Sequence, residues 1–393
     1  MEKVFGIVKE AIRNIDPVLF GSSVLLSLIS IVTVYGAVDN FGASKLKMQI
    51  AMFLVGVLVT VLIAFVDYRV IVEKLWIPML AGSVLLLVIT LLFGESGVNM
   101  ETGNKSWLKI PGTGFMIQPS EFIKFTFVCT FARHLFAVKE HINKPLNVLL
   151  LAGHALLVVG PILVSGDLGV ALVYVALIAL MLFCAGLHPG YFAAVIVLVV
   201  LAAPYLWEHL AHYQQMRILV GFNPDLDPGG YGWQPLLSRT AIASGGFFGQ
   251  GIMGGHYYEE LPASHTDFIF STVCEKFGFL GGALVIIIFM VMVVRIFSIA
   301  RSASRSDFGG LICVGVGSMF VVQILENVGM CFAMLPTVGI TLPLLSCGGS
   351  SMLATFMMLG LLHNVYAHSK GVKDVVGRGG LDMDVSLFEK IDS

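Results

Sequence analysis

The residues best suited to chemistry in this sequence lie directly before a long apolar run. In the stretch 259–270, His265 and Thr266 precede Asp267, which is the last polar residue before that run. A carboxylate at the start of a helix is stabilised by free N–H groups and by the helix dipole, so Asp267 can serve as a helix cap. A carboxylate fixed at this point can also accept a proton as a general base. The residues alone leave both interpretations open.

Other ionisable residues lie inside or between apolar segments. A charge at bilayer depth costs about 2.5–3.5 kcal/mol on insertion scales, so each one needs a reason. Glu121 and Lys124 share one face of an expected helix, where they can neutralise each other or line a polar cavity. Asp167 lies in a tight turn, where a cap would explain it. For Glu275 and Glu326, the choice between polar contacts among helices and a functional role stays open.

The segment 335–351 must leave the helical conformation. Pro336, Pro343 and three glycines interrupt it between two apolar blocks. Non-helical backbone at membrane depth is tolerated only inside protein or beside a water-filled cavity. The glycines together with Ser350 and Ser351 can present N–H groups to an anionic head group, or they can simply let two helices approach closely. Both alternatives remain.

These residues must be positioned by membrane-spanning helices. The chain has 393 residues, of which 57% are apolar and 12% charged, and its mean hydropathy is +0.91. Soluble domains are about 45–50% apolar and about 25% charged, so the composition predicts an all-α polytopic membrane protein. About 20 apolar residues cross the bilayer as a helix. On that template we expect ten spans: 17–38, 48–66, 75–93, 119–138, 148–165, 168–186, 189–207, 268–297, 309–335 and 348–367.

The basic residues orient these spans. With the N-terminus inside, fifteen of the 23 Lys and Arg fall in inner segments and six in outer loops, which is a positive-inside bias. We therefore expect a cytoplasmic segment 1–16, a transmembrane domain 17–367 and a flexible, polar cytoplasmic tail 368–393. The charged groups near 121, 167 and 267 then lie at the outer ends of their spans. Charged groups that meet at one depth indicate a wet, charged cleft at the outer side. Such a cleft suits a substrate with a polar or anionic head and an apolar tail.

The long outer loop 208–266, between the seventh and eighth spans, is rich in Gly and Pro turns. Long loops of this kind on a rigid scaffold often carry function. Its aromatic residues predict a packed lid on the outer surface, the alternative being an unstructured linker. These aromatic residues are Phe222, Tyr231, Trp233, Phe247, Phe248, Tyr257 and Tyr258.

Composition and motifs also exclude several classes. The net charge of −2 gives no basic field that would attract nucleic acid. No glycine-rich phosphate loop follows a strand-like run, so nucleotide-driven pumping has no support. The sequence contains no dedicated metal-binding motif, so we expect no cofactor bound by a recognisable motif.

Four stretches together resemble the SEDS family of bacterial membrane proteins, whose named types are RodA and FtsW. They are residues 103–107 leading to 118–124, residues 166–169, residues 261–282 and residues 335–351. The Pro and Gly pattern at 223–234 fits the large outer loop of that family. The resemblance spans nearly all of 17–367 with the motifs in the order of the family. It departs at Cys347, where many members have Tyr, and at Lys276, where Glu is common.

The resemblance implies a peptidoglycan glycosyltransferase that polymerises lipid II at the outer face of the cytoplasmic membrane. Asp267 matches the key acidic residue of the family, while Glu121, Lys124 and Asp167 match positions that line its central cavity. The residues of this chain suggest further contacts. Lys124, Arg217 or a divalent cation (Mg²⁺ or Mn²⁺) carried with the diphosphate can stabilise the leaving group. Head-group contacts are expected from four more residues: His265, Thr266, Ser350 and Ser351.

Two other functions compete with this one. A flippase for the lipid-linked precursor would use the same charged cavity without bond chemistry, but it needs a path to both faces. The ionisable groups crowd the outer side, which favours the enzyme. A scaffold is the third possibility, because the resemblance implies a class B penicillin-binding protein, a transpeptidase, as partner. The scaffold and enzyme roles can both hold. The sequence does not decide between elongation, division and sporulation.

Overall fold

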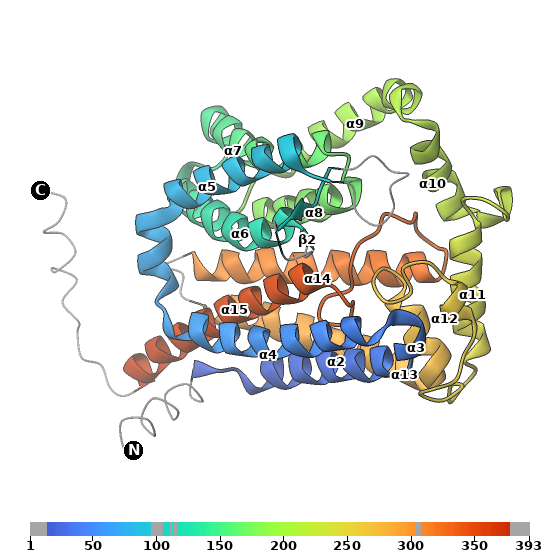
Figure 1. The fold of residues 1–393 in the computed structure, drawn as a ribbon. Helices are drawn as coiled ribbons and strands as arrows, with labels where there is room; N and C mark the ends of the chain where they lie inside the picture. Colours follow the sequence, from blue (N-terminus) through green and yellow to red (C-terminus); the bar gives the residue numbers. More distant parts are fainter. Residues whose placement is uncertain (1–13, 96–104, 111, 113–115, 304–307, 378–393) are drawn as a thin grey trace, which may run out of the picture.

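The computed structural model describes residues 14–95, 105–110, 112, 116–303 and 308–377. Within them the chain forms long helices that lie side by side, with the helices of the outer loop across one end (Figure 1). Ten long helices coincide with the ten predicted spans, and the all-α polytopic membrane fold is confirmed. They are α2 (Pro17–Tyr35), α4 (Ala43–Phe65), α5 (Tyr68–Phe93), α6 (Pro119–Ala137), α7 (Pro145–Val164), α8 (Leu168–Cys184), α9 (Pro189–His209), α13 (Ile269–Ser302), α14 (Gly309–Cys331) and α15 (Gly349–Gly377).

Seven of these ten helices are long and apolar enough to cross a membrane by length and composition alone. The other three are α8, which has 17 residues, and α6 and α15, which carry more polar side chains. α5 begins at Tyr68, earlier than expected, because the Asp67 carboxylate accepts the Arg69 N–H at 3.0 Å and caps the helix. α15 continues to Gly377, so the expected flexible tail is wrong for residues 368–377. The remainder of that tail lies outside the described residues.

Short elements connect the long helices. Between α5 and α6, strands β1 (Leu108–Lys109) and β2 (Met116–Ile117) pair antiparallel, with Leu108 opposite Ile117. The other short elements are α3 (Val38–Phe41), η2 (Lys139–His141), α10 (His212–Phe222), η3 (Pro224–Leu226), α11 (Trp233–Ser244) and α12 (Tyr257–Glu260).

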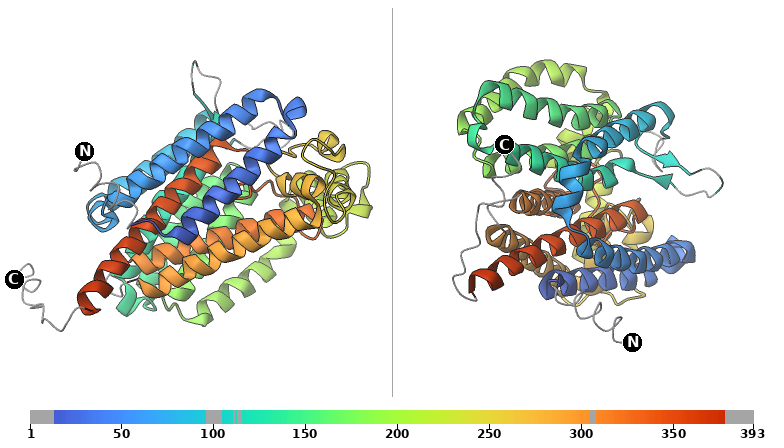
Figure 2. Two further views of the ribbon diagram at one scale, coloured as in Figure 1. Left: turned by 90° about the horizontal axis from the view of Figure 1, so that it is seen from below. Right: turned by 90° about the vertical axis from the view of Figure 1, so that its left-hand side faces the viewer.

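The bundle has two groups of helices (Figure 2). Helices α6 to α9 gather on one side, and α2, α4, α13, α14 and α15 on the other. α4 and α15 approach closely because each places a glycine against the other helix: a β-carbon on Gly56 would lie 2.2 Å from the Phe356 ring, and one on Gly360 would lie 2.8 Å from the Ile63 side chain. The Thr60 hydroxyl donates to the Phe356 carbonyl at 2.8 Å in the same contact. α9 stands apart, with no buried residue along its length.

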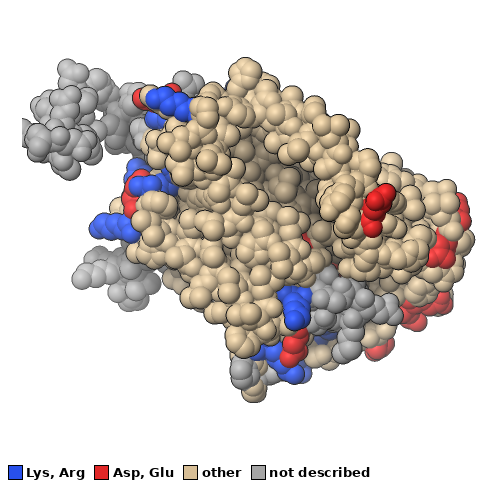
Figure 3. Space-filling model, turned by 90° about the horizontal axis from the view of Figure 1, so that it is seen from above, with Lys and Arg blue, Asp and Glu red and all other residues tan. Residues whose placement is uncertain are grey.

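The start of α2 and the end of α15 lie at the same end of the bundle. On the face shown in Figure 3, one group of Lys and Arg lies at that end and a second group lies nearer the middle, whereas most of the Asp and Glu lie at the opposite end, over the outer-loop helices. The same view shows that this face of the molecule is hollowed near its middle.

The outer loop is built of helices and is not an unstructured linker. α11 packs on α13 and α14 through its small and apolar side, and the Ser238 hydroxyl lies 2.6 Å from the Ser271 hydroxyl. The expectation that its aromatic rings pack as a lid is mostly wrong. Tyr258 is buried, but five others are exposed because small residues make the helix contacts: Phe222, Tyr231, Trp233, Phe247 and Phe248.

α13 is broken at Gly278, where φ is 66° and ψ is −163°. The outer-loop segment 246–251 supplies hydrogen bonds at the break. The Gln250 N–H donates to the Glu275 carbonyl at 2.9 Å, and the Phe279 N–H donates to the Gly246 carbonyl at 2.8 Å. The first part of α13, residues 269–277, is therefore joined to the outer loop by backbone hydrogen bonds.

The close approach at this break predicts the effect of Gly249→Ala. Gly249 has φ +86°, and a β-carbon there would lie 2.2 Å from the Lys276 carbonyl oxygen. Gly251 also has a positive φ, +94°, but nothing lies within 4 Å of its β-position. Each Ala costs about 1–2 kcal/mol in backbone strain, and only Gly249→Ala adds the clash. We expect a lower midpoint of thermal unfolding for Gly249→Ala than for Gly251→Ala. Equal midpoints would contradict the close approach.

Candidate active site

Asp267 lies in the turn between α12 and α13. α13 begins at Ile269, and no side chain caps it, so the interpretation of Asp267 as a helix cap is wrong. Asp267 is half-buried, and its carboxylate faces the connection between α14 and α15. A β-carbon on Gly339 in that connection would lie 3.3 Å from Asp267 Oδ2. The two stretches that the sequence singled out, 259–270 and 335–351, thus meet at this carboxylate.

The surroundings of Asp267 change its acidity. The pKa of its carboxyl is raised to about 6, mainly by burial, and the nearby Asp167 carboxylate contributes to this increase. The Thr266 hydroxyl, which hydrogen-bonds the carboxylate, and the Arg217 guanidinium both lower the pKa. A carboxyl with this pKa is about nine-tenths ionised at pH 7, while it binds a proton far better than an ordinary Asp. Asp267 is therefore suited to accept a proton near neutral pH.

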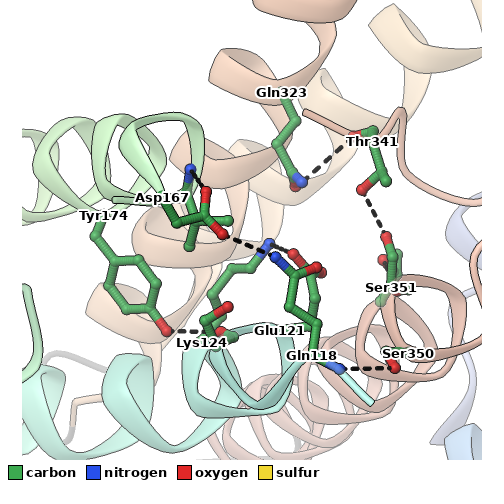
Figure 4. A network of polar contacts seen from close by, with 12 residues as sticks. Gln118, Glu121, Lys124, Asp167, Tyr174, Gln323, Thr341, Ser350 and Ser351 are labelled. Carbon is green, nitrogen blue, oxygen red and sulfur yellow. Dashed lines mark hydrogen bonds and ion pairs between the residues drawn. The ribbon is translucent and has the colours of Figure 1, made fainter. Parts of the chain in front are cut away.

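A polar network connects the other predicted residues (Figure 4). The Gln118 side chain donates to Asp167 Oδ2 at 3.0 Å, and the Gln118 backbone N–H donates to the Ser350 hydroxyl at 3.3 Å. The hydroxyls of Ser351 and Thr341 lie 2.8 Å apart. Residues from α6, from the turn after α7 and from the start of α15 thus converge on one region, as the sequence predicts.

Asp167 caps the start of α8 and also belongs to this network. Its Oδ1 accepts the Val170 N–H at 3.1 Å at the start of α8. Burial raises the pKa of the Asp167 carboxyl, although hydrogen bonds from Val170, Ser106 and Gln118 counteract the shift. A small pocket opens beside it, lined by residues of α5, α6 and α7 together with Ser106 and Ser165.

Glu121 and Lys124 neutralise each other. Their side chains form an ion pair of 2.7 Å between Lys124 Nζ and Glu121 Oε1, and only 1% of the Lys124 side chain and 5% of the Glu121 side chain are exposed. Figure 4 shows the pair on α6, beside the side chain of Gln118, the residue that precedes this helix. Of the two sequence interpretations, internal pairing is the one that the geometry favours.

The remaining predicted residues surround Asp267. Arg217, on α10, is partly exposed, and its guanidinium lies 5.9 Å from the centre of the Tyr213 ring. The His265 ring packs 5.1 Å from Phe41, and burial lowers the pKa of His265 to about 4, so its imidazole is neutral at pH 7. The single hydrogen of the Thr266 hydroxyl can go either to the Asp267 carboxylate or to the Ala263 carbonyl, which lies 3.3 Å from the hydroxyl oxygen.

Sequence reasoning missed Asn327 as part of the site. It lies on α14, fully buried, and its side-chain amide donates to the Asp267 carbonyl at 2.7 Å. The only signal in the sequence is an amide within an apolar span, which has many possible partners. Glu275, whose role was open, accepts the backbone N–H groups of residues 256–258 at 2.8–2.9 Å and so fixes the outer loop.

The described residues contain no group of three or more His, Cys, Asp or Glu side chains that could hold a metal ion. Asp267 and Asp167 influence each other electrostatically, but they form no ligand set with a third acidic or imidazole group in these parts of the chain.

Residues 15–371 match the FtsW/RodA/SpoVE family, described as cell cycle proteins. The chain belongs to this family. Its relatives include a probable peptidoglycan glycosyltransferase FtsW of Trichlorobacter lovleyi, which is 34% identical over 90% of this chain and 94% of its own length. Stage V sporulation protein E of Bacillus subtilis is 30% identical over 90% of this chain and 98% of its own length.

Solved structures agree with membership of the FtsW/RodA/SpoVE family. A chain from a peptidoglycan synthase complex, studied for the coordination of polymerization and crosslinking, is 28% identical with a TM-score of 0.78. That match covers 90% of this chain and 98% of the other. RodA of Thermus thermophilus is 26% identical with a TM-score of 0.66, covering 90% and 96%. The protein is thus a multi-pass membrane protein of the FtsW/RodA/SpoVE family.

Proposed function

We propose that this protein is a peptidoglycan glycosyltransferase that polymerises lipid II at the outer face of the cytoplasmic membrane. The observation that carries the proposal is the Asp267 carboxylate, which caps no helix, has a raised pKa and faces both Gly339 and the outer loop. The names of the FtsW relatives support the same activity.

In the proposed reaction Asp267 takes the proton from the acceptor sugar hydroxyl. The hydroxyl oxygen forms a bond to the anomeric carbon of the donor while the bond from that carbon to the diphosphate oxygen breaks. Undecaprenyl diphosphate leaves with the electron pair, and the proton on Asp267 passes to water. Direct displacement of this kind inverts the anomeric centre, as in inverting glycosidases.

The leaving diphosphate needs stabilisation of its charge more than it needs a proton. Arg217 is the better placed cation for this, because it is partly exposed and acts on Asp267, whereas the Lys124 ammonium is buried against Glu121. We propose that Lys124, Glu121 and Asp167 contribute through the network of Figure 4. Four further residues are proposed to contact the head group: His265, Thr266, Ser350 and Ser351.

A divalent cation has a place in the proposal only as part of the substrate. We propose that Mg²⁺ or Mn²⁺ arrives bound to the diphosphate, because Mg²⁺ commonly binds substrate phosphates with one or two carboxylates. Polymerisation measured with and without a chelator, and again after Mg²⁺ or Mn²⁺ is added back, tests the requirement.

We further propose that both ends of the chain are cytoplasmic. The Lys and Arg at the end of the bundle where α2 starts and α15 ends support this orientation. A reporter that works only in the cytoplasm should be active when it is fused after Ser393, and a reporter that works only outside the membrane should be inactive there. Activity restricted to the outside would reverse the orientation and put Asp267 on the wrong side.

The decisive experiment is polymerisation of labelled lipid II by the purified chain, alone and with a class B penicillin-binding protein. The proposed partner is a transpeptidase of that class, supported by the likeness to a chain of a peptidoglycan synthase complex. Labelled glycan strands are the expected product. Movement of lipid II across vesicles without any glycan, from folded and partnered protein, would favour the flippase. The absence of both glycan and lipid II movement would favour the scaffold.

Polymerisation should depend on pH through Asp267. The base acts in its deprotonated form and its pKa is raised to about 6, so the rate should rise as pH increases through about 6. Below that value it should fall about tenfold per pH unit. His265, with its pKa lowered to about 4, does not titrate in this window. A rate that stays constant down to pH 4.5 would contradict the raised pKa.

A further inference from the structure

Three consecutive backbone carbonyls, those of His265, Thr266 and Asp267, each accept a hydrogen bond from α14 or from the connection between α14 and α15. The Cys347 N–H donates to the His265 carbonyl at 2.8 Å, and the Ser346 hydroxyl donates to the Thr266 carbonyl at 2.7 Å. The Asn327 amide donates to the Asp267 carbonyl at 2.7 Å. The turn that carries the proposed base is therefore held from one side at every residue.

Asn327 joins this turn to a second segment. Its amide nitrogen has two hydrogens, and the second one goes to the Ile340 carbonyl, also at 2.7 Å. Ile340 follows Gly339, whose β-position lies 3.3 Å from Asp267 Oδ2. One buried side chain thus sets the separation between Asp267 and the segment that its carboxylate faces.

Ser346 makes a similar connection. Its hydroxyl donates to the Thr266 carbonyl and accepts the Leu342 N–H at 2.8 Å, so it links the same turn to the same connection. Ser346 is 2% exposed, and Asn327 is fully buried, so water does not replace these bonds freely. Without them the turn would keep the bond from the Cys347 N–H to the His265 carbonyl and the local bonds to the carbonyl of Ala263, which itself has a positive φ of 55°.

We propose that Asn327 and Ser346 are positioning residues, which hold the Asp267 carboxylate at the distance from the Gly339–Leu342 segment that proton transfer requires. The inference rests on the proposed function and assigns a role in positioning the base to two buried side chains. A general base works only within about 2.6–3.2 Å of the proton that it removes. Displacement by about 1 Å is therefore enough to reduce turnover without preventing substrate binding.

The chain offers a matched control for Asn327. Asn364, on α15, is also fully buried, and its amide nitrogen donates to two carbonyls, those of Ile63 and Val66. It lies at the opposite end of the bundle, where α4 ends and α5 begins. Asn364→Leu removes the same pair of bonds as Asn327→Leu, so both variants lose a comparable amount of stability. Only one of them loosens the Asp267 turn.

The experiment compares Asn327→Leu, Ser346→Ala and Asn364→Leu with the native protein. Lipid II polymerisation gives kcat, KM and the pH profile for each, normalised to folded protein. Hydrogen exchange of the peptide 261–272 reports the turn without requiring activity. We expect kcat to fall at least tenfold in Asn327→Leu and several-fold in Ser346→Ala, with KM within about threefold. Exchange of 261–272 should accelerate, and the midpoint of the acidic limb should move below pH 6 as the carboxylate becomes better hydrated.

Asn364→Leu should retain the native kcat, pH midpoint and exchange of 261–272. The proposal is overturned if Asn327→Leu and Ser346→Ala match Asn364→Leu in these quantities. If Asn327→Leu fails to fold, Ser346→Ala decides in the same way. Failure of the proposed function looks different, because the native protein would then form no glycan while exchange of 261–272 would still distinguish the variants.

Discussion

Asp267→Asn should reduce lipid II polymerisation by about 10²–10⁴-fold, the usual contribution of a general base. The amide keeps the shape of the side chain and its bond with Thr266, but it cannot take the proton of the acceptor hydroxyl. Binding of lipid II should change little, because the variant loses an interaction that matters mainly during proton transfer. Initial rates and lipid II affinity, measured on the same preparation, separate the two effects.

Asp267→Asn should make the folded protein slightly more stable, although it lowers the rate of polymerisation. Because burial raises the pKa of Asp267 to about 6 in the folded protein, the ionised carboxylate is less favourable there than in the unfolded chain. Asp267→Asn should therefore unfold at a slightly higher temperature than the native protein at pH 7.5. The difference should vanish below about pH 4, where the native carboxyl is protonated in both states. Asp225→Asn, an exposed change in the same loop, should alter neither quantity. Full polymerisation by Asp267→Asn would remove Asp267 as the base.

Lys276→Met should strongly destabilise the outer loop. Lys276 is fully buried, and its ammonium donates to the carbonyls of Gly36, Ile252 and Gly254 at 3.0–3.1 Å. It also lies 4.0 Å from the centre of the Tyr258 ring. Methionine fills similar space but leaves three carbonyls without their charged donor. Each buried carbonyl left without a hydrogen-bond partner costs about 1–3 kcal/mol.

The loss should be local as well as global. Hydrogen exchange of residues 250–258 should accelerate before the transmembrane helices are affected, and the midpoint of thermal unfolding in detergent should fall. Lys47→Met removes the same charge at an exposed position on α4 and should leave both measurements unchanged. If Lys276→Met and Lys47→Met gave the same unfolding midpoint, the three hydrogen bonds of Lys276 would have no net effect on stability.

The transmembrane fold was predictable because each span is an apolar block of about the length that a bilayer requires. The ends of the helices were less predictable, since they depend on individual contacts. α5 begins at Tyr68 because Asp67 caps it, and α15 continues through polar residues to Gly377. The prediction of an aromatic lid was wrong for a physical reason. Apolar rings near a membrane surface do not need to be buried in protein. α11 instead packs on the bundle through Ser238 and Ala241.

Asp267 was recognisable as a candidate from its position before an apolar run, but its setting was not. Whether it caps α13 depends on where the helix begins, and that residue is set by contacts distant in sequence. The contact between Asn327 and Asp267 joins residues 60 positions apart. A buried amide in a helix specifies that partners exist and does not identify them. The pairing of Glu121 with Lys124 was predictable, because helical spacing alone brings them together.

The break at Gly278 determines the height of the reaction above the lipid. From residue 279 to Ser302 the helix alone measures about 36 Å at 1.5 Å per residue, already more than a hydrocarbon core of about 30 Å. Residues 269–277 are therefore not needed for the crossing, and they can carry Asp267 beyond the hydrocarbon core. A lipid-linked sugar can then meet this carboxylate while its tail remains in the bilayer.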